Sequence, residues 1–497
     1  MAKDTVSKDA RLSEGSTCYL MVPPFFKYAA GPLLGPAILE GTAKKQGLRV
    51  RTIDLNIEYI RFMDPFQMES GLSTKFYGDH AKPSGHLDKV EYNFWRTIEN
   101  GFNKKPILSA SQIKKGWYSH SQLYNAVECL SDSPLGVFIR DNLDNLSKPP
   151  LLGVSIMWGG QIVAGMLVSM LAKLKWPNTK IVWGGPHMTS IIKEVIQSKE
   201  FGRWVDGYMP GRCEESFIKL LNSIMKGKFE APGLVVPGQG NPVNVATPIS
   251  SPSYPEFPDL TRYGYPILTI PMQLGIGCIY SRCSFCTYPT IEGKYRNLPI
   301  EWLDRLIHLA VGKDATISFK DSLVPPNLLR DISDVVSGKV EWSACTKLSP
   351  CLDKKLLVHI EQGGCRTLEV GLESLAPETQ LRINKKTSTE VLDRFLKNAS
   401  FAGISVIINY ITGFPWEESE KTEEILRNLK RRLKTHKGLV ACVEHNNFDL
   451  ERLSPMAQNP AKYDILITNS WPWSSILEWK TRKKTHMIEV MPRQLRG

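Results

Sequence analysis

Residues 277–286 read Gly-Cys-Ile-Tyr-Ser-Arg-Cys-Ser-Phe-Cys and place Cys278, Cys283 and Cys286 within nine residues. This loop directly follows an apolar, strand-like run at residues 266–274. Thiolates are soft ligands that suit zinc or an iron–sulfur cluster. A structural zinc ion takes four protein ligands, and no neighbouring Cys or His pair supplies the fourth. Three thiolates on a four-iron cluster leave one iron open, and an open iron can chelate the amino and carboxylate groups of a small molecule. The stretch therefore predicts a [4Fe-4S] site, with a structural zinc or three structural cysteines as alternatives.

The composition predicts an ordinary globular protein with several domains, because 42% of the 497 residues are hydrophobic and 23% are charged. No apolar run is long enough to span a membrane, and the first residues lack the layout of a signal peptide. We therefore expect a cytoplasmic protein with no membrane partner, whose seven other cysteines are free thiols. The net charge of +12 is concentrated in residues 421–497. We interpret it as a solvated basic face and expect no nucleic-acid partner, because aromatic residues do not interleave with these charges.

Downstream of the cysteine loop the sequence alternates between strand and helix patterns. Helical stretches separate six strand-like runs, at residues 266–274, 315–319, 340–344, 367–372, 405–411 and 438–443. Six such units are too few for a complete eight-stranded barrel but suit a partial (β/α)6 barrel.

The chain upstream of the loop has its own β/α alternation, which predicts a second parallel sheet. Strand-like runs lie at residues 17–24, 49–56, 151–157 and 180–185, with helical patterns between them. We expect an α/β protein of five parts: a Rossmann-like domain from residues 1–65 and 146–229, a helical insertion at 66–145, a proline-rich linker at 230–262, the partial barrel at 263–450, and a C-terminal substrate or lid segment at 451–497.

The cysteine triplet resembles that of the radical S-adenosylmethionine (SAM) superfamily, in which an aromatic residue, here Phe285, precedes the last cysteine. The usual spacing is Cys-x3-Cys-x2-Cys, whereas the first gap here is four residues. Further resemblances follow in family order, with Asp321 after the second strand and Gly371-Leu372-Glu373-Ser374 after the fourth. The resemblance implies that the three cysteines hold a [4Fe-4S] cluster and that SAM is contacted by Phe285, Asp321, Gly371, Glu373 and Ser374.

The amino-terminal half resembles the cobalamin-binding domain that precedes the radical domain in the cobalamin-dependent branch. The residues that carry this resemblance follow the strands, and Gly211-Arg212-Cys213-Glu214-Glu215 stands in place of the family's Gly-Glu-Gly-Glu segment. The Asp-x-His-x-x-Gly loop that supplies a cobalt ligand elsewhere is absent from the sequence, so we expect His187 to be structural. The resemblance implies cobalamin contacts from Asp54, Asn56, Ser155, Trp158, Gly184, Gly185 and Glu214.

Together these resemblances imply a cobalamin-dependent radical SAM enzyme, most simply a methyltransferase acting on an unactivated carbon through a 5′-deoxyadenosyl radical and methylcobalamin. Two alternatives stay open: a cobalamin-assisted rearrangement, cyclisation or ring contraction, and a non-catalytic cobalamin or cluster sensor. The expected partners are a small-molecule or peptide substrate and an external one-electron reductant of the flavodoxin or ferredoxin type.

Overall fold

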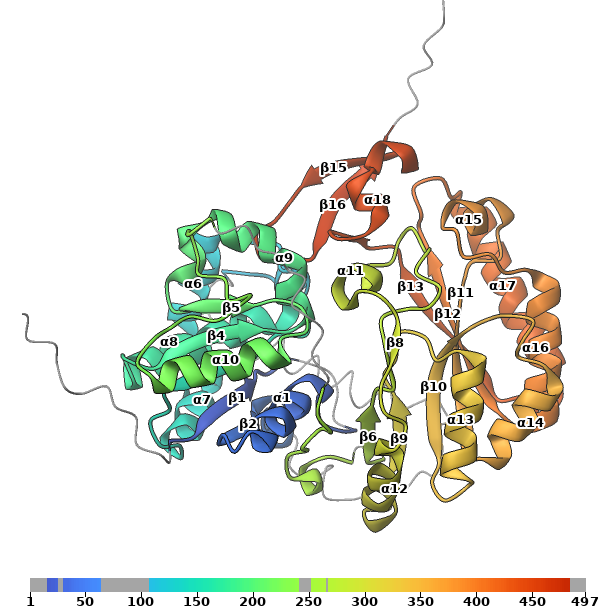
Figure 1. Ribbon diagram of the computed structural model, residues 1–497. Helices are drawn as coiled ribbons and strands as arrows, with labels where there is room; N and C mark the ends of the chain where they lie inside the picture. The colour runs from blue at the N-terminus through green and yellow to red at the C-terminus, as the bar shows by residue number, and fades with distance from the viewer. Residues whose placement is uncertain (1–15, 26–29, 64–106, 241–251, 265–266, 483–497) are drawn as a thin grey trace, which may run out of the picture.

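The computed structural model describes residues 16–25, 30–63, 107–240, 252–264 and 267–482. Two parallel sheets lie side by side in the molecule, each flanked by helices, and a small antiparallel sheet lies beside both (Figure 1). The predicted α/β fold, a Rossmann-like domain followed by a partial barrel, is confirmed.

The first sheet has the strand order β2-β1-β3-β4-β5, and every neighbouring pair is parallel. Of these strands only β5 is missing from the sequence-based expectation, because a run of three residues is too short to show a period. The helix α8 is buried on every side over Ile162–Ala172, since the sheet covers one face and further helices cover the other. The elements are β1 (Cys18–Val22), α1 (Leu34–Lys45), β2 (Val50–Asp54), α2 (Leu55–Met63), β3 (Leu151–Ser155), α8 (Ile162–Lys175), β4 (Lys180–Gly184), α9 (Pro186–Gln197), β5 (Gly207–Met209) and α10 (Glu214–Met225).

The expected helical insertion lies partly outside the described residues, which resume at Ile107. Its described part contains α5 (Ala110–Lys115), α6 (His120–Leu130) and α7 (Pro134–Asp144), and α6 and α7 pack on α8. Ser109 and Ser119 each begin a helix with a capping box.

The barrel sheet has the order β13-β12-β11-β10-β9-β6, all parallel, so the six predicted strands are confirmed in chain order. The last strand starts later than expected and runs on through Glu444–Asn447, a polar stretch that hydrophobic patterning does not mark as strand. Helices α12 to α17 cover the outer face (Figure 1). The elements are β6 (Thr269–Met272), α12 (Trp302–Gly312), β9 (Thr316–Phe319), α13 (Pro326–Val336), β10 (Trp342–Lys347), α14 (Lys354–Gln362), β11 (Cys365–Glu373), α15 (Pro377–Arg382), α16 (Thr389–Ala402), β12 (Ser405–Thr412), α17 (Ser419–Thr435) and β13 (Ala441–Asn447).

The described part of the C-terminal segment forms a three-stranded antiparallel sheet, β14 (Leu450–Glu451), β16 (Ile476–Thr481) and β15 (Ile465–Asn469), with the short helix α18 (Pro455–Gln458). This segment joins the two halves. Trp473 is fully buried against Phe201, 4.3 Å away between ring centroids, and its carbonyl accepts a 2.8 Å hydrogen bond from His187 Nε2. The structural role expected for His187 is thus confirmed. Residues 483–497 of the predicted lid lie outside the described residues.

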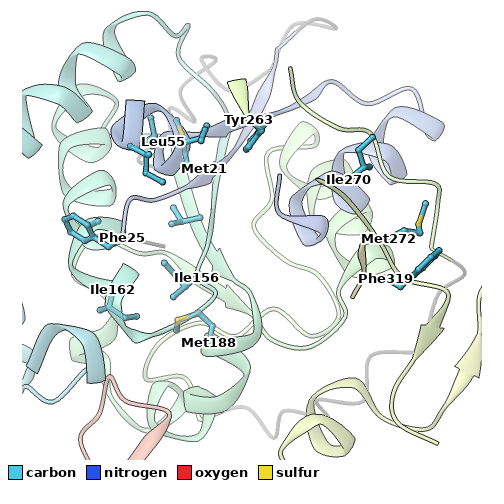
Figure 2. Close-up of a cluster of buried hydrophobic side chains, with 14 of the residues drawn as sticks. Met21, Phe25, Leu55, Ile156, Ile162, Met188, Tyr263, Ile270, Met272 and Phe319 are labelled. Carbon is cyan, nitrogen blue, oxygen red and sulfur yellow. The ribbon is translucent and has the colours of Figure 1, made fainter. Parts of the chain in front are cut away.

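One hydrophobic core continues from the first sheet into the barrel. Figure 2 shows part of it, from Met21 and Ile156 on the first sheet to Ile270 and Phe319 on the barrel strands. Tyr263, directly after the expected linker, donates a 2.7 Å hydrogen bond from its hydroxyl to Asp54. Among the described residues, no helix combines the length and apolar character needed to cross a membrane.

Candidate active site

The cysteine loop is closed at its base by a small hairpin. The strand β7 (Gly275–Ile276) pairs antiparallel with β8 (Arg296–Asn297), and the loop between them ends in the helix α11 (Tyr288–Glu292). Gly277 begins the loop with φ +77°, and a Cβ there would lie 2.6 Å from the Gly293 carbonyl oxygen, so glycine is required. The Glu292 carboxylate accepts hydrogen bonds from the Gly277 amide at 3.0 Å and the Ser322 hydroxyl at 2.7 Å. This base fixes where the first cysteine starts.

The widened first gap is absorbed by a local turn. Ser281 adopts the left-handed conformation with φ +45°, and its hydroxyl donates to the Cys278 carbonyl. The Tyr280 hydroxyl donates to the Asn384 carbonyl at 2.6 Å, and the Asn384 amide donates back to the Arg282 carbonyl at 3.0 Å. The extra residue therefore lengthens the turn between Cys278 and Cys283 while both ends of the turn stay anchored.

Hydrogen bonds also hold the second half of the loop. The Ser284 amide donates to the Ile383 carbonyl at 3.0 Å, and its hydroxyl donates to the Arg382 carbonyl at 2.8 Å. On the other side the Met456 amide donates to the Ser284 carbonyl at 2.9 Å. The cysteines are thus carried on a backbone that is tied to both α15 and α18.

The three thiols are partly exposed and differ in environment. Burial raises the pKa of the Cys286 thiol to about 12. Burial also raises the pKa of Cys283, while the nearby Lys385 ammonium opposes that rise. In the described part of the chain no three His, Cys, Asp or Glu side chains converge on a point that would hold a single metal ion. A [4Fe-4S] cluster does not need such convergence, because each thiolate binds a different iron.

A buried ion pair faces the loop from the fourth barrel strand. Lys385 Nζ lies 2.9 Å from Glu373 Oε1, and both side chains are nearly inaccessible. A β-bulge between Gly371 and Glu373, together with φ +66° at Glu373, turns this carboxylate toward the lysine. A Cβ on Gly371 would lie 2.5 Å from atoms of both partners. The Gly-x-Glu-Ser stretch therefore has a physical reason: the glycine makes room for the ion pair.

Two other residues predicted to contact SAM have their side chains in structural contacts. Asp321 is buried, accepts hydrogen bonds from the Leu274 and Gly275 amides, and has its pKa raised to about 7 by burial. Ser374 is fully buried, and its hydroxyl accepts from the Ala376 amide at 3.1 Å. Their contacts with SAM stay predictions.

Phe285 packs edge-on against Phe414, with ring centroids 6.5 Å apart, and Phe414 stacks on Trp416. The aromatic residue before the last cysteine thus joins the loop to a hydrophobic cluster shared with the C-terminal sheet. Its predicted place near the adenine of SAM also stays a prediction.

A polar layer lies one step deeper in the barrel and was not singled out from the sequence. Glu369 on β11 accepts a 2.7 Å hydrogen bond from the Asn409 amide on β12 and interacts electrostatically with Cys345 on β10 and with Lys320, which follows β9. Burial lowers the pKa of Lys320 and raises that of Cys345. Alternation along strands places these side chains on one face, but no sequence motif marks them.

Gly184, the last residue of β4, and Gly185, the N-cap of α9, are glycines for different reasons. Gly185 has φ +103°, and a Cβ there would lie 2.3 Å from the Ile156 carbonyl oxygen. Gly184 has no positive φ, and a Cβ there would approach only the Met209 carbonyl, at 3.3 Å. Backbone conformation and packing therefore require glycine at position 185. At position 184 the main effect of glycine is that no side chain covers the carboxyl end of β4.

The remaining residues predicted to contact cobalamin lie along the same edge, mostly in structural contacts. Asp54 is buried, and its carboxylate accepts hydrogen bonds from the backbone amides of Asn56 and Ile57 in the first turn of α2. It also accepts a hydrogen bond from the Tyr263 hydroxyl, and burial raises the pKa of Asp54 to about 6. Asn56 is buried, and Ser155 at the end of β3 is half-buried. Trp158 Nε1 donates to the Phe25 carbonyl at 2.8 Å. Whether these residues touch cobalamin stays a prediction.

The segment around Glu214 connects the two sheets. Arg212, after β5, donates through Nε and Nη2 to the buried Glu214 carboxylate, at 3.0 and 2.7 Å. Its Nη1 donates to Gln273 Oε1 at 2.9 Å, and the Gln273 amide donates to Glu292 at 3.2 Å. Because Glu292 also holds Gly277, this chain of contacts runs from the edge of the first sheet to the start of the cysteine loop. The sequence motif singled out residues 211–215, but nothing in the sequence indicated that Arg212 contacts Gln273.

Comparison with known proteins identifies the second half. Residues 272–429 match the radical SAM superfamily. An uncharacterized methyltransferase of Pyrococcus horikoshii is 24% identical over 57% of this chain and 64% of its own length. The anaerobic magnesium-protoporphyrin IX monomethyl ester cyclase of Rubrivivax gelatinosus is 24% identical over 58% and 55%, and the bacteriochlorophyllide d C-12(1)-methyltransferase of Chlorobaculum tepidum is 24% identical over 49% and 52%. The matches span between half and two thirds of these relatives.

Two solved structures share the architecture of nearly the whole chain. The radical SAM methyltransferase TsrM from Kitasatospora setae, with cobalamin and a [4Fe-4S] cluster bound, superposes with a TM-score of 0.62 at 14% identity, over 92% of this chain and 81% of its own. The cobalamin-dependent radical SAM enzyme OxsB, with aqua-cobalamin bound, gives 0.63 at 15% identity, over 93% and 64%. Residues 272–429 therefore match the radical SAM domain, and the chain as a whole shares the fold of these two solved structures.

Proposed function

We propose that this protein is a cobalamin-dependent radical SAM enzyme that transfers a methyl group to an unactivated carbon of a small molecule or peptide. The observation that carries the proposal is the connection of the three-cysteine loop to the glycine-ended edge of the first sheet through Arg212, Gln273 and Glu292. When bound, the three groups supply one electron from the cluster, a radical precursor from SAM and a methyl carrier in cobalamin.

The donor set fits a cluster with one open iron. Cys278, Cys283 and Cys286 supply three soft ligands from one loop, and hydrogen bonds hold that loop on both sides. The buried Lys385 and the half-buried Lys347 place positive charge beside the thiols, which favours their thiolate forms. In this proposal the loop orients the ligands and the two lysines offset their negative charge.

The fourth barrel strand supplies the orienting groups for SAM in this proposal. Glu373 is fixed by Lys385 and by its own left-handed backbone, so its carboxylate position is set before any ligand binds. Gly371 lies next to the pair and adds no side chain, so the space around the Glu373 carboxylate and the Lys385 ammonium stays free. The role of this strand is to hold SAM against the open iron.

The edge of the first sheet fits a large flat ligand best at Gly184. A crevice outside the carboxyl ends of parallel strands is where open α/β sheets bind ligands. Gly184 leaves backbone uncovered there, and the neighbouring loop after β3 exposes Met157, 37% accessible, beside Trp158. In this proposal these residues would lie against bound cobalamin. His187 would not bind its cobalt, because His187 is buried and hydrogen-bonded to the Trp473 carbonyl.

A second candidate function is a radical cyclisation or rearrangement on the same scaffold. The observation that favours it is the cyclase of Rubrivivax gelatinosus, which matches as much of this chain as the methyltransferases do. The two functions differ in the product: methyl transfer adds the mass of one methylene group to the substrate, and a cyclisation or rearrangement does not.

The test is anaerobic reconstitution with iron, sulfide and cobalamin. The wild-type protein is expected to show the absorption of a [4Fe-4S] cluster and to release 5′-deoxyadenosine from SAM under reduction. Cys283→Ala is expected to lose both properties, because the remaining two thiolates do not hold the cluster. A Cys283→Ala protein that kept its iron and its SAM cleavage would contradict the proposal.

A further inference from the structure

We propose that the basic hollow on the outer face of the cysteine loop is the docking surface for an acidic one-electron carrier protein of the flavodoxin type. This inference rests on the proposed function, which needs an external electron, and it adds where and how that electron enters.

The hollow has a volume of about 540 Å³ and lies between the cysteine loop, α15 and the region of α18. In Figure 1 both helices lie near the top of the view, above the barrel strands. The residues that line the hollow and matter here are Arg282, Ser284, Leu381, Arg382, Lys462 and Asp464.

This hollow is the outer surface of the cluster loop itself. Arg282 and Ser284 both line it, and they are the covalent neighbours of Cys283. Asn384, which also lines the hollow, donates to the Arg282 carbonyl. A carrier seated in the hollow therefore contacts residues that are bonded directly to a proposed cluster ligand.

The charges around the hollow leave a net positive surface. Arg382 pairs with two carboxylates, Asp464 at 2.9 Å and Glu378 at 3.0 Å, so these three side chains together carry one net negative charge, which the two positive charges of Arg282 and Lys462 outweigh. Arg282 and Lys462 are exposed, and neither forms an ion pair with any described residue. Positive charge at the rim steers an acidic partner and orients it during encounter.

Apolar side chains in and beside the hollow add contact surface. Leu381 lines the hollow and is 80% exposed, and Ile279, elsewhere in the cysteine loop, is 56% exposed. Transient redox complexes are small, and a few apolar contacts within a charged rim suffice for them. The hollow has both features next to the redox site.

A second basic hollow provides a matched control. It is lined by Arg330 and Lys355 among others, on α13 and α14. Figure 1 shows these helices on the flank of the barrel, away from α11 and the cysteine loop. Both of these side chains are exposed, so reversing them changes the net charge equally without touching the proposed docking surface.

The transfer balances without any change in bonds. One electron leaves the reduced carrier, which is oxidised by one electron, and the cluster held by the three thiolates is reduced by one electron. Neither a proton nor a covalent bond is exchanged in this step.

The experiment compares three full-length proteins with reconstituted clusters: wild type, Arg282→Glu/Lys462→Glu, and Arg330→Glu/Lys355→Glu. We measure the rate of cluster reduction by a purified acidic flavodoxin at low ionic strength, the Kd for the oxidised flavodoxin, and the rate of reduction by dithionite. The Arg282/Lys462 variant is expected to be slower with flavodoxin and to bind it more weakly, each by about tenfold, with the difference shrinking at high salt. Its reduction by dithionite should match that of the control variant.

Two results overturn the inference: equal effects of both double variants on flavodoxin binding, or no effect of either. The Kd measurement needs no cluster, so it decides the question even for protein that fails to assemble one. Failure of the proposed function is a different result, namely wild-type protein that binds no cluster. Arg282→Gln/Lys462→Gln, which removes the charges without reversing them, is expected to give a smaller effect in the same direction.

Discussion

The carboxyl ends of the two parallel sheets are built in different ways. At the edge of the first sheet, the Asp54 carboxylate makes structural hydrogen bonds: it caps α2 and accepts a hydrogen bond from the Tyr263 hydroxyl. What this edge offers a ligand is backbone, at Gly184. On the barrel, ionisable side chains face one another, with Glu373 on Lys385 and Glu369 near Lys320.

This difference indicates what each edge can recognise. A glycine edge accepts a large flat ligand by shape, and changes there act through steric overlap. A charged edge positions small charged groups and thiolates, and changes there act through electrostatics. Substitutions at the two edges should therefore differ in both the size and the physical origin of their effects.

Neutralising the buried ion pair should have the largest effect. Glu373→Gln leaves Lys385 as an uncompensated buried charge, so we expect a loss of about 4 kcal/mol in the free energy of unfolding of the cluster-free protein. Glu373→Gln/Lys385→Met should recover much of that loss. Urea denaturation of the single and double variants measures the coupling between the two residues, and additive losses would show that the pair does not act as a unit.

The two glycines of β4 should respond very differently to alanine. Gly185→Ala forces a positive φ on alanine and an overlap with Ile156, so we expect a loss of about 3 kcal/mol in stability. Gly184→Ala should change stability little but weaken cobalamin binding, because the methyl group occupies the open edge. Thermal unfolding and cobalamin titration of both variants check this; equal stability losses would contradict the contrast drawn between the two positions.

The contact between His187 and Trp473 should make stability depend on pH. Burial and the nearby Arg452, itself paired with Glu194, lower the pKa of His187 to about 4, below its ordinary value of 6.5. Below pH 6.5 the His187 imidazole is protonated in the unfolded chain but stays neutral in the folded protein. The free energy of unfolding therefore falls as the pH falls. The loss should reach about 2 kcal/mol at pH 5. Urea denaturation between pH 4 and 8 measures it, and His187→Gln should flatten this part of the profile; an unchanged slope would exclude His187 as its source.

The smallest effect is expected where the two edges are joined. Arg212→Lys keeps the charge beside Glu214 but loses the forked contact that also reaches Gln273, which should cost about 1 kcal/mol in stability. We also expect an altered electron paramagnetic resonance spectrum of the reduced cluster, because Glu292 and Gly277 lie next along this chain of contacts. Lys219→Ala, which removes only an exposed pair with Glu215, should leave the spectrum unchanged. A spectrum equally insensitive to Arg212→Lys would show that the contact is only structural.

Much of the architecture follows from local patterns in the sequence. The six barrel strands and the helices between them are visible in the hydrophobic periodicity, and the cysteine triplet marks the first loop. Residues 381–387 resemble a family segment that has glycine at the position of Lys386. The φ of Lys386 is +55°, the left-handed conformation that favours glycine, so the resemblance indicated this turn despite the changed residue.

What the sequence did not reveal are contacts made only by the tertiary fold. Lys385 meets Glu373 because a β-bulge and a left-handed residue redirect the carboxylate, and neither feature has a periodic signature. Gln273 reaches Arg212 across 61 residues of sequence. The strand β5 is too short for its pattern to be read, and β13 ends in polar residues.

In the proposed function, two neighbouring sheet edges hold two different cofactors through different groups, thiolates at the barrel and glycine-ended backbone at the first sheet. Iron and cobalamin are measured on the same anaerobically reconstituted samples of wild type, Cys283→Ala and Cys351→Ala, an exposed cysteine outside the loop. This arrangement predicts that Cys283→Ala loses its cluster iron and keeps its cobalamin, whereas Cys351→Ala keeps both. Retention of the full iron content by Cys283→Ala, or absence of cobalamin from the wild-type protein, would contradict it.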